Sequence, residues 1–360
     1  MLNVTGVRWL INGYEEWLAK ENVPVATGLA VDPLSIETKL WPRLGVNASI
    51  IHLDSRGNFQ NAYLLDIAPG KATERQHHLY EAVVYVLDGQ GSTVIEHPDG
   101  SRRSFEWHRG SLFAVPVNMA YRIFNSSGQQ RARMVAVTNL PMLMKLFRNE
   151  KFIFDTPFDF SERYRDEKFF RGEGTFIPVA EHRNQWETNF VPDLLTFDQM
   201  RISNGRGKGS TNIMFILADG TMHAHMSGIP VGGYKKSHKH REGFHIFQLS
   251  GAGYSLYWRN RDYAAAGEEP IRVDWTYGLM HAPPAGVWHQ HFNVAGEEAR
   301  YMAINFGSLR YPFFEEDVKG MLRPSNLPND TQIEYEDENP EIRKLFETEV
   351  AKHRKSAVPA

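Results

Sequence analysis

The sequence predicts an all-β protein made of two copies of one sandwich or barrel, and three observations lead to this fold class. The chain has 360 residues, which exceeds the usual size of a single core and favours two domains. Short apolar runs recur between Gly, Pro and Asp residues, as in a sandwich or barrel of short strands. Glycine-containing segments of the first half return in the second half, which indicates a duplicated domain.

The first half opens with residues 1–60, which read as an arm in front of a barrel. Residues 10–21 predict one short helix, and residues 45–60 are polar and rich in turn residues. The first barrel is expected over residues 61–140, where the strand-like runs are AYLLDI, AVVYVLDG, STVIEH, SLFAVP, YRIFN and RMVAVTN. Residues 141–210 are expected to form a connecting segment that includes a helix.

The second half repeats the pattern. The second barrel is expected over residues 211–310, where the strand-like runs are NIMFILADG, MHAHMSGIPVG, HIFQLSGAG, YSLYWR, IRVDW and ARYMAINFG. Residues 311–360 are expected to be a tail that ends in a helix. Acidic residues near the start of that helix and basic residues near its end suit the helix dipole.

Composition excludes several functional classes. The formal net charge is −3 and no run of Lys and Arg stands out, so we expect no nucleic-acid partner. The N-terminus lacks a basic segment followed by an apolar one, and no apolar stretch is long enough to span a bilayer. We therefore expect a cytoplasmic protein with no membrane partner.

Histidines are crowded into one stretch of the second half, SHKHREGFH (237–245), although the chain has only 15. On a strand, His238 and His240 point to the same face because alternate residues share a face. The chain has no cysteine, so His, Asp or Glu would have to hold any transition metal. Neutral imidazoles that converge inside a barrel need a partner for their lone pairs, and a divalent metal is such a partner.

This stretch resembles the first signature motif of the cupin superfamily, G(X)5HXH(X)3–4E(X)6G. Its first glycine is Gly232, and its HXH pair is His238 and His240. His245 falls where cupins have Glu, and Gly251 closes the motif one residue early. The second motif, G(X)5PXG(X)2H(X)3N, is matched at every fixed position, by Gly278, Pro284, Gly286, His289 and Asn293. The resemblance implies two tandem cupin barrels (double-stranded β-helices of the jelly-roll type) with short flanking helices.

The resemblance also implies a metal site whose ligands are His238, His240, His245 and His289. Because all four would be neutral, an anionic chelating substrate would bind partly by neutralising the metal. Cysteine dioxygenase, β-diketone dioxygenase and gentisate dioxygenase are cupins with all-histidine sites that use ferrous iron. Fe(II) is therefore the metal expected, with Mn, Zn, Ni and Cu as alternatives. Glu242, two residues past His240, is a competing carboxylate ligand.

The first half carries the same spacing without the ligands. Gln76 and His78 take the places of the HXH pair, Ala82 takes the place of Glu, and Tyr121 stands where the last His belongs. One good ligand does not hold a catalytic metal. We therefore expect the first barrel to be structural or to mediate dimerisation.

Further groups are expected around the second-barrel site. His291, two residues after His289, should face the same interior and could be an acid or base, a hydrogen-bond partner of a ligand, or a further ligand. Tyr254 is the other candidate for proton transfer. The side chains expected to line the substrate pocket are His223, His225, Phe247, Trp258, Trp288 and Asn293. The aromatic ones could equally belong to the core.

Over its whole length the chain resembles one group of long bicupins, which genomes often label "ethanolamine ammonia-lyase activating protein". No GXXXXGK[ST] phosphate loop of an ATP-dependent reactivase is present. We expect a non-haem iron(II) dioxygenase that cleaves a C–C bond of a small chelating substrate, with dioxygen as co-substrate. A redox-neutral lyase, isomerase or decarboxylase is the alternative, and a binding or activating protein is the third. We also expect a homo-oligomer, paired through the arm and the C-terminal helix.

Overall fold

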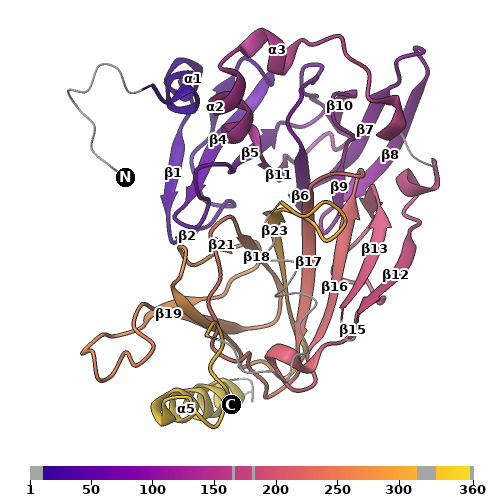
Figure 1. The fold of residues 1–360 in the computed structure, drawn as a ribbon. Helices are drawn as coiled ribbons and strands as arrows, with labels where there is room; N and C mark the ends of the chain where they lie inside the picture. The colour runs from indigo at the N-terminus through magenta and orange to yellow at the C-terminus, as the bar shows by residue number, and fades with distance from the viewer. Residues whose placement is uncertain (1–10, 164–166, 181–182, 314–329, 357–360) are drawn as a thin grey trace.

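The computed structural model describes residues 11–163, 167–180, 183–313 and 330–356 (Figure 1). Strands hold far more of these residues than helices do, and the strands form two barrels, the first above the second in the view of Figure 1. The predicted all-β fold with two tandem barrels is confirmed. None of the helices in the described ranges has the length and apolarity that crossing a bilayer requires.

The first barrel consists of a large and a small sheet. The large sheet has the order β1-β4-β5-β11-β6-β9-β14 with β3 paired to β4, and the small sheet has the order β10-β7-β8. The bounds are β1 Val25–Gly28, β3 Lys39–Trp41, β4 Val46–Leu53, β5 Asn61–Ile67, β6 Ala82–Asp88, β7 Gln90–Glu96, β8 Arg102–His108, β9 Leu112–Ala114, β10 Ala120–Asn125 and β11 Ala132–Thr138.

The second barrel repeats this topology and adds one strand, β12, at the edge of its large sheet. Its large sheet has the order β12-β13-β16-β17-β23-β18-β21-β2 with β15 paired to β16, and its small sheet has the order β20-β19-β22. The bounds are β12 Thr175–Ala180, β13 Arg183–Thr188, β15 Arg201–Ile202, β16 Thr211–Leu217, β17 Met222–Ile229, β18 His245–Ser250, β19 Gly253–Trp258, β20 Ile271–Asp274, β21 Met280–His281, β22 Trp288–Asn293 and β23 Ala299–Phe306.

Each large sheet ends in a two-residue strand that comes from the other half of the chain. β2 (Ala30–Val31) follows β1 of the first barrel, yet it pairs with β21 of the second. β14 (Phe190–Val191) follows β13 of the second barrel, yet it pairs with β9 of the first. The exchange covers the main-chain groups that an edge strand would otherwise expose.

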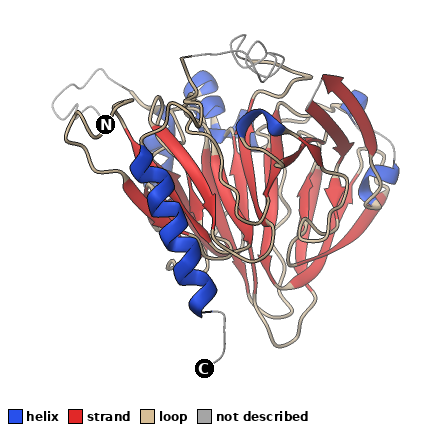
Figure 2. Cartoon of the chain, turned by 90° about the horizontal axis from the view of Figure 1, so that it is seen from below, coloured by secondary structure: helices blue, strands red, loops and turns tan. Residues whose placement is uncertain are grey.

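Short helices flank the barrels. They are α1 Gly13–Glu21, α2 Leu140–Phe147, α3 Glu150–Phe154, the 3-10 turns η1 Ser161–Arg163, η2 Glu167–Phe170 and η3 Asn204–Arg206, and α5 Pro340–Ser356. Figure 2 shows α5 lying across one end of the strands. Its Ile342 and Phe346 pack on the outer face of the second barrel's small sheet, against Tyr254, Trp258 and Phe292.

The core has one layer between the barrels and one inside each barrel. The large sheets face each other through Phe215, Phe247 and Tyr85, among others, and β17 touches β6 directly. The first barrel is filled by aromatic and aliphatic side chains. The apolar cluster inside the second barrel is much smaller, and many of the buried side chains there are polar.

The expectation that residues 45–60 are a polar turn region is wrong. β4 runs through VNASIIHL there, and seven of its eight residues are buried. It pairs with β5 and β1, so the first sheet begins inside the segment expected as an arm. Likewise, β12 and β13 of the second sheet lie in the expected connecting segment. Residues 1–10 of the arm and 314–329 of the tail lie outside the described residues.

Gly253→Ala is expected to destabilise the second barrel by about 3 kcal/mol. A Cβ at this position would lie 2.0 Å from the Phe292 carbonyl oxygen and 2.5 Å from the Trp275 ring, so the β19–β22 pairing would have to shift. Gly296→Ala is the control, because a Cβ there meets nothing within 4 Å. Urea unfolding of both variants measures the difference; equal stabilities would contradict the close approach of these two strands.

Candidate metal centre

Three histidine side chains meet inside the second barrel. His238 and His240 come from the segment before β18, and His289 comes from β22. One ring nitrogen of each lies within 4.8 Å of the other two. The ring of His289 lies 4.1 Å from that of His238 and 4.6 Å from that of His240.

Main-chain hydrogen bonds hold the two segments together. His238 and His289 exchange N–H···O bonds of 3.0 and 2.8 Å, which places their side chains opposite each other. The turn that leads into β22 contains Gly286 at φ 72°, a left-handed conformation that favours glycine. The N–H of Gly286 donates to the His240 carbonyl at 2.9 Å, so the turn also fixes the third histidine.

The hydrogen bonds of the three rings select one tautomer. In each ring Nδ1 faces a main-chain carbonyl, which only accepts: His238 faces Lys236 at 2.9 Å, His240 faces Arg241 at 2.8 Å, and His289 faces Val287 at 3.2 Å. Nδ1 therefore carries the proton, and Nε2 keeps a free lone pair. Burial lowers the pKa of His240 to about 3 and those of His238 and His289 well below the ordinary value, so the rings are neutral.

This arrangement fits a divalent metal. His289 Nε2 is buried and has no hydrogen-bond partner among the described residues, which is costly unless something binds it. A main-chain carbonyl on the far ring nitrogen is the usual way in which proteins orient a metal-ligating histidine. Three such rings pointing at one another supply half of an octahedral coordination sphere or most of a tetrahedral one.

His245, expected as a fourth ligand, is not brought to this centre. It shares the face of β18 that carries Phe247, and that face packs into the layer between the barrels. Its ring is fully buried beside His52 and Arg56, and neither ring nitrogen has a partner among the described residues. Adjacent residues of a strand point to opposite faces. Phe244 therefore faces the barrel interior, whereas His245, one residue later, faces away from it.

Phe244 takes the place of the expected carboxylate. Its ring lies 4.0 Å from that of His240 and belongs to the interior cluster of the second barrel. Three residues separate His240 from Phe244, and six separate Phe244 from Gly251. Both spacings are those that the cupin motif has around its Glu. Glu242, the competing ligand, turns instead toward Gly57 in the loop between β4 and β5. The described residues therefore bring no carboxylate to the three histidines.

Phe244→Glu is expected to tighten binding of divalent metals by on the order of tenfold, because it returns an anionic oxygen to a site of neutral ligands. Competition with a chromophoric chelator measures the dissociation constant. Phe244→Gln is the control for shape, and it should leave the constant near that of the parent protein. Equal affinities for the Glu and Gln variants would show that position 244 does not face the metal.

His291 lies in the same interior, as its spacing predicted. Its ring is 5.4 Å from that of His289. Its Nδ1 lies 2.8 Å from Ser255 Oγ, and that oxygen accepts a hydrogen bond from Trp275 Nε1 at 2.9 Å. The hydroxyl fixes the orientation of the imidazole next to the three histidines. A histidine held in this way can bind or transfer a proton.

Another buried histidine, His281, was not predicted from the sequence as a site residue. It lies on β21, where its Nδ1 bonds to the Tyr257 hydroxyl and its Nε2 lies 2.7 Å from Gln248 Nε2. Its ring is 6.1 Å from that of His291. His281 extends the polar lining of the barrel. The internal repeat does not mark it as a site residue, because Phe113 occupies the equivalent position in the first barrel.

His223 and His225, which were expected at the pocket, face the barrel interior from β17. Both flank Ala224, which packs into the layer between the barrels. The ring of His225 lies 6.3 Å from that of Phe244, near the metal ligands. Burial lowers the pKa of each to about 3, so both are neutral. His223 Nδ1 is buried without a partner in the described chain.

Two basic residues that the sequence reading missed also point into this barrel. Lys235 is 4% exposed, and burial, followed by the charges of Arg206 and Arg183, lowers its pKa to about 7. Arg206 follows the same pattern: burial, then Arg183, lowers its pKa to about 10. Arg206 also adds to the lowered pKa of all three candidate ligands. The surroundings of the histidines are therefore strongly positive.

The other residues expected at the pocket do not reach the centre. Tyr254, Trp258 and Trp288 lie on the outer face of the small sheet beneath α5, and Phe247 lies between the barrels. Asn293 is the last residue of β22, and its side-chain NH2 donates to the carbonyls of Ile229, Pro230 and Glu297. Asn125 bonds to the equivalent carbonyls in the first barrel, which has no such histidines.

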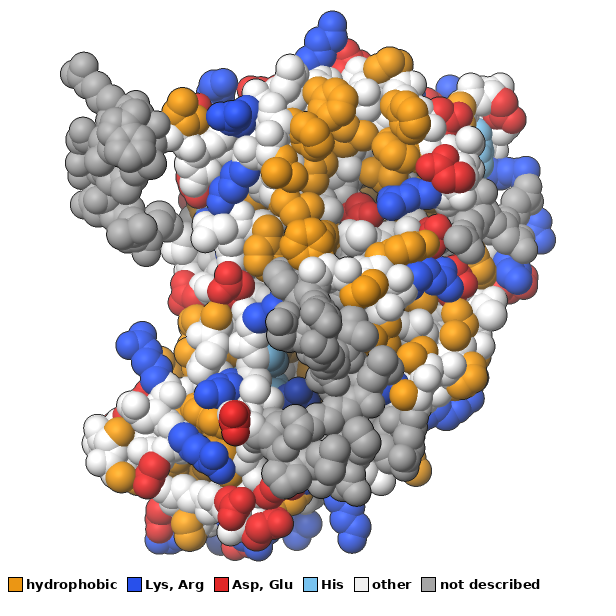
Figure 3. Space-filling view, viewed as in Figure 1, with side chains coloured by type: hydrophobic (Ala, Val, Ile, Leu, Met, Phe, Trp, Pro, Cys, Tyr) orange, Lys and Arg blue, Asp and Glu red, His pale blue; other side chains and the backbone are white. Residues whose placement is uncertain are grey.

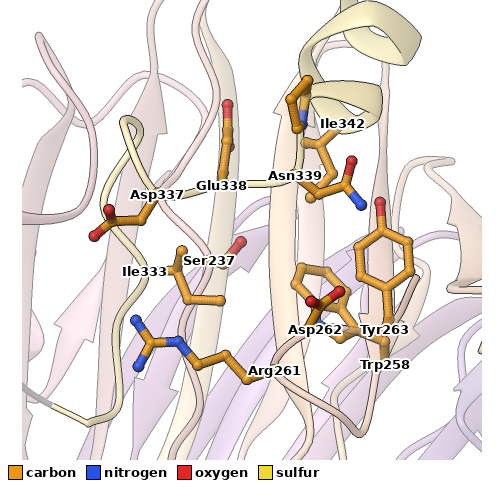
Figure 4. A pocket seen from close by; sticks show the side chains of 11 residues that line it. Ser237, Trp258, Arg261, Asp262, Tyr263, Ile333, Asp337, Glu338, Asn339 and Ile342 are labelled. Carbon is orange, nitrogen blue, oxygen red and sulfur yellow. The ribbon is translucent and has the colours of Figure 1, made fainter. Parts of the chain in front are cut away.

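Figure 4 shows a cavity of about 460 Å³ on this outer side. Most of its lining comes from the β19–β20 loop and the segment that leads into α5, and the rest comes from β19, from α5 itself and from Ser237. The residues are Ser237, Trp258, Arg261, Asp262, Tyr263, Ile333, Asp337, Glu338, Asn339, Pro340 and Ile342. None of the three candidate ligands lines it, so this cavity is separate from the metal centre.

The equivalent position in the first barrel is occupied by hydrogen-bonded aromatic groups. His78 Nε2 lies 2.9 Å from the Tyr121 hydroxyl, and its Nδ1 lies 2.8 Å from the Tyr80 carbonyl. The Tyr63 and Tyr80 hydroxyls are 3.4 Å apart. Gln76 donates to main-chain carbonyls. Both ring nitrogens of the one histidine are therefore used, and it has no lone pair left for a metal.

Comparisons with known proteins bear on the fold. No protein-family model and no curated protein matches the chain. Among solved structures, an oxalate decarboxylase of Lactobacillus farciminis in complex with formate has a TM-score of 0.50 at 13% identity, over 88% of this chain and 96% of that one. It is built from two cupin barrels. The chain has the bicupin fold.

Two further structures are oxalate decarboxylases of Bacillus subtilis. A mutant has a TM-score of 0.48 at 13% identity, over 85% of each chain. The enzyme described with Mn(II) centres has a TM-score of 0.46 at 13% identity, also over 85% of each chain. At this identity the likeness concerns the fold alone. Nothing in the comparisons bears on the ethanolamine ammonia-lyase activating protein label for this bicupin.

Proposed function

We propose that this bicupin is a metal-dependent enzyme that carries out a redox-neutral reaction, of the lyase or decarboxylase type, on a small substrate with acidic oxygens. The observation that supports it is the set of three imidazoles inside the second barrel whose Nδ1 atoms all face carbonyls and whose ring nitrogens converge. The buried Nε2 of His289 has no hydrogen-bond partner among the described residues, which is costly unless a ligand binds it.

His238, His240 and His289 would hold the metal. When bound, a divalent ion acts as a Lewis acid that stabilises negative charge on a substrate oxygen. Because the three histidines are neutral, they leave the charge of the ion uncompensated and favour an anionic substrate. His291 is placed to bind or move a proton beside that oxygen, and Ser255 holds its ring in position.

The expectation of an iron dioxygenase has less support than the redox-neutral alternative. Its basis was an all-histidine site with four ligands, and His245 is turned away from the centre. The solved structures reported above are decarboxylases, and one is described with manganese. We therefore propose a first-row divalent ion without preferring iron, and dioxygen is not part of the proposed net reaction.

Metal analysis and turnover assays test this proposal. Protein purified without added metal is expected to contain about one divalent ion per chain. A panel of small mono- and dicarboxylates is then assayed for CO2 release and for oxygen uptake. Product formation without net oxygen consumption supports the proposal. Stoichiometric oxygen consumption would instead favour the dioxygenase, and full biological activity of a metal-free variant would favour a binding or activating protein.

We also propose that the chain forms a homo-oligomer. Figure 3 shows apolar side chains gathered over the upper part of the molecule, in the region of α2 and α3. Leu146, Phe147 and Phe152 of these helices are 65%, 49% and 43% exposed. Light scattering after size exclusion measures the mass, and a mass of one chain would contradict the proposal.

A further inference from the structure

Two basic side chains inside the second barrel lack an anionic partner, and we propose that Lys235 and Arg206 form an oxyanion subsite beside the metal centre. The subsite would bind a carboxylate or phosphate group on the part of the substrate that does not reach the metal. This inference deepens the proposed function and rests on it for the position of the rest of the substrate.

Lys235 is directed inward by its two neighbours. The Tyr234 ring stacks on Phe292 beneath α5, and the Lys236 ammonium pairs with Glu334 on the outside. Between them, Lys235 points to the barrel interior, and its N–H donates to the His291 carbonyl at 2.9 Å. The residue is 4% exposed, and no hydrogen bond or ion pair reaches its ammonium from any described residue.

Arg206 lies next to Lys235. Its carbonyl accepts a hydrogen bond from the Lys236 N–H at 2.7 Å, so η3 is held against the segment that carries Lys235. A Cβ on Gly207 would lie 3.5 Å from Lys235 Cδ, which shows how closely the lysine stem passes η3. Arg206 Nη1 is buried and unpartnered within the described ranges. Buried guanidinium nitrogens are ordinarily hydrogen-bonded.

The acids nearby do not neutralise these charges. Glu298 is the carboxylate that acts on Lys235, but its oxygens accept from Thr211 Oγ1 at 3.2 Å and from Arg300 Nε at 2.9 Å. Arg183 on β13 adds positive charge on the same side. A metal on the three histidines would add more. Burying a cation without a counter-charge lowers the stability of the folded protein, and binding of an oxyanion would offset that cost.

The pairing of a guanidinium with an ammonium defines the ligand chemistry. The planar fork of Arg206 binds two oxygens of one group, and the lysine adds a compact charge to a third or shared oxygen. Carboxylates and phosphates both meet this requirement. The substrate would therefore be a small molecule with at least two acidic groups, one on the metal and one on Lys235 and Arg206.

The test compares Lys235→Met with Lys236→Met. The first variant removes a buried charge without a partner, so it is expected to fold and to raise the midpoint of thermal unfolding in the absence of anions. The second removes the neighbouring charge that is already paired on the outside, and it should leave anion binding unchanged. Arg206→Gln provides an independent variant of the same subsite.

Calorimetry with malonate and with inorganic phosphate measures binding to each protein, and metal content is determined on the same samples. We expect the parent protein to bind at least one of these anions, and Lys235→Met and Arg206→Gln to weaken it by about tenfold or more. Binding of malonate alone identifies a carboxylate subsite, and binding of phosphate alone identifies a phosphate subsite. Equal constants for Lys235→Met and Lys236→Met, or no binding by the parent protein, would overturn the inference.

The metal analysis separates this inference from the proposed function. Anion binding that depends on Lys235 in a protein that takes up no metal would leave the subsite standing and reject the metal-dependent enzyme. If the protein contains the metal but Lys235→Met binds anions as tightly as the parent protein, the subsite is refuted and the proposed function is not.

Discussion

Replacement of His240 by alanine is expected to remove the bound metal and to abolish turnover. Loss of an outer hydrogen-bond partner already costs a metal site about 10- to 100-fold in affinity, so loss of a direct ligand should cost more than about a hundredfold. Only His238 and His289 would remain, and two neutral imidazoles do not retain a first-row ion against a chelator. Elemental analysis after dialysis against a weak chelator measures the loss.

His78→Ala is the matched control for that experiment. His78 occupies the equivalent position of the first barrel and is buried, but its ring nitrogens are bonded to Tyr121 and Tyr80. This variant should lose stability while it retains the metal of the parent protein. If both variants lost the metal equally, loss of folding would explain the result, and if His240→Ala retained it, the three-histidine centre would be refuted.

Stability is expected to fall steeply when the pH drops below about 6.5. Burial lowers the pKa of His52 to about 3 and that of His78 to about 4, whereas an unfolded histidine titrates near 6.5. Between these values the unfolded chain binds more protons than the folded one, so acid favours unfolding. Each of the two histidines contributes about 1.4 kcal/mol per pH unit within its window, a contribution that is fully present above pH 6.5.

Urea unfolding of metal-free protein at pH 7.5, 6.0 and 5.0 measures this dependence. The two histidines together should lower the free energy of unfolding by about 3 kcal/mol between pH 6.5 and 5.0. The buried histidines of the second barrel act in the same direction. His78→Gln should show a shallower slope than the parent protein, whereas replacing the exposed His108 should leave the slope unchanged. A parent protein equally stable at pH 5.0 and 7.5 would contradict the neutral buried state of these rings.

The sequence predicted the fold and the three-histidine centre because both rest on short-range patterns. Alternation along strands and the glycine spacings of the two motifs are local, and they brought His238, His240 and His289 together correctly. The prediction that His245 takes the place of the motif's Glu is wrong. Gly70, His78 and Ala82 stand 162 positions before Gly232, His240 and Phe244, so the internal repeat itself marks Phe244 as the equivalent position.

The rest of the site depends on register and on distant contacts. β19 pairs with β22 so that Ser255 and Tyr257 oppose His291 and His289, which turns Tyr254 and Trp258 outward. No residue type in the sequence reveals that choice of face, because both faces of this strand are buried. Arg206 was not predicted for a different reason. It lies in the short 3-10 turn η3, which only tertiary packing brings next to the second barrel.

The reciprocal placement of β2 and β14 gives the chain the architecture of a domain-swapped dimer joined into one polypeptide. Each half supplies the last strand of the other half's large sheet, so one sheet edge of each half would be exposed if that half stood alone. The first half lacks the three converging histidines, yet the large sheet of the second barrel is incomplete without the strand that this half lends.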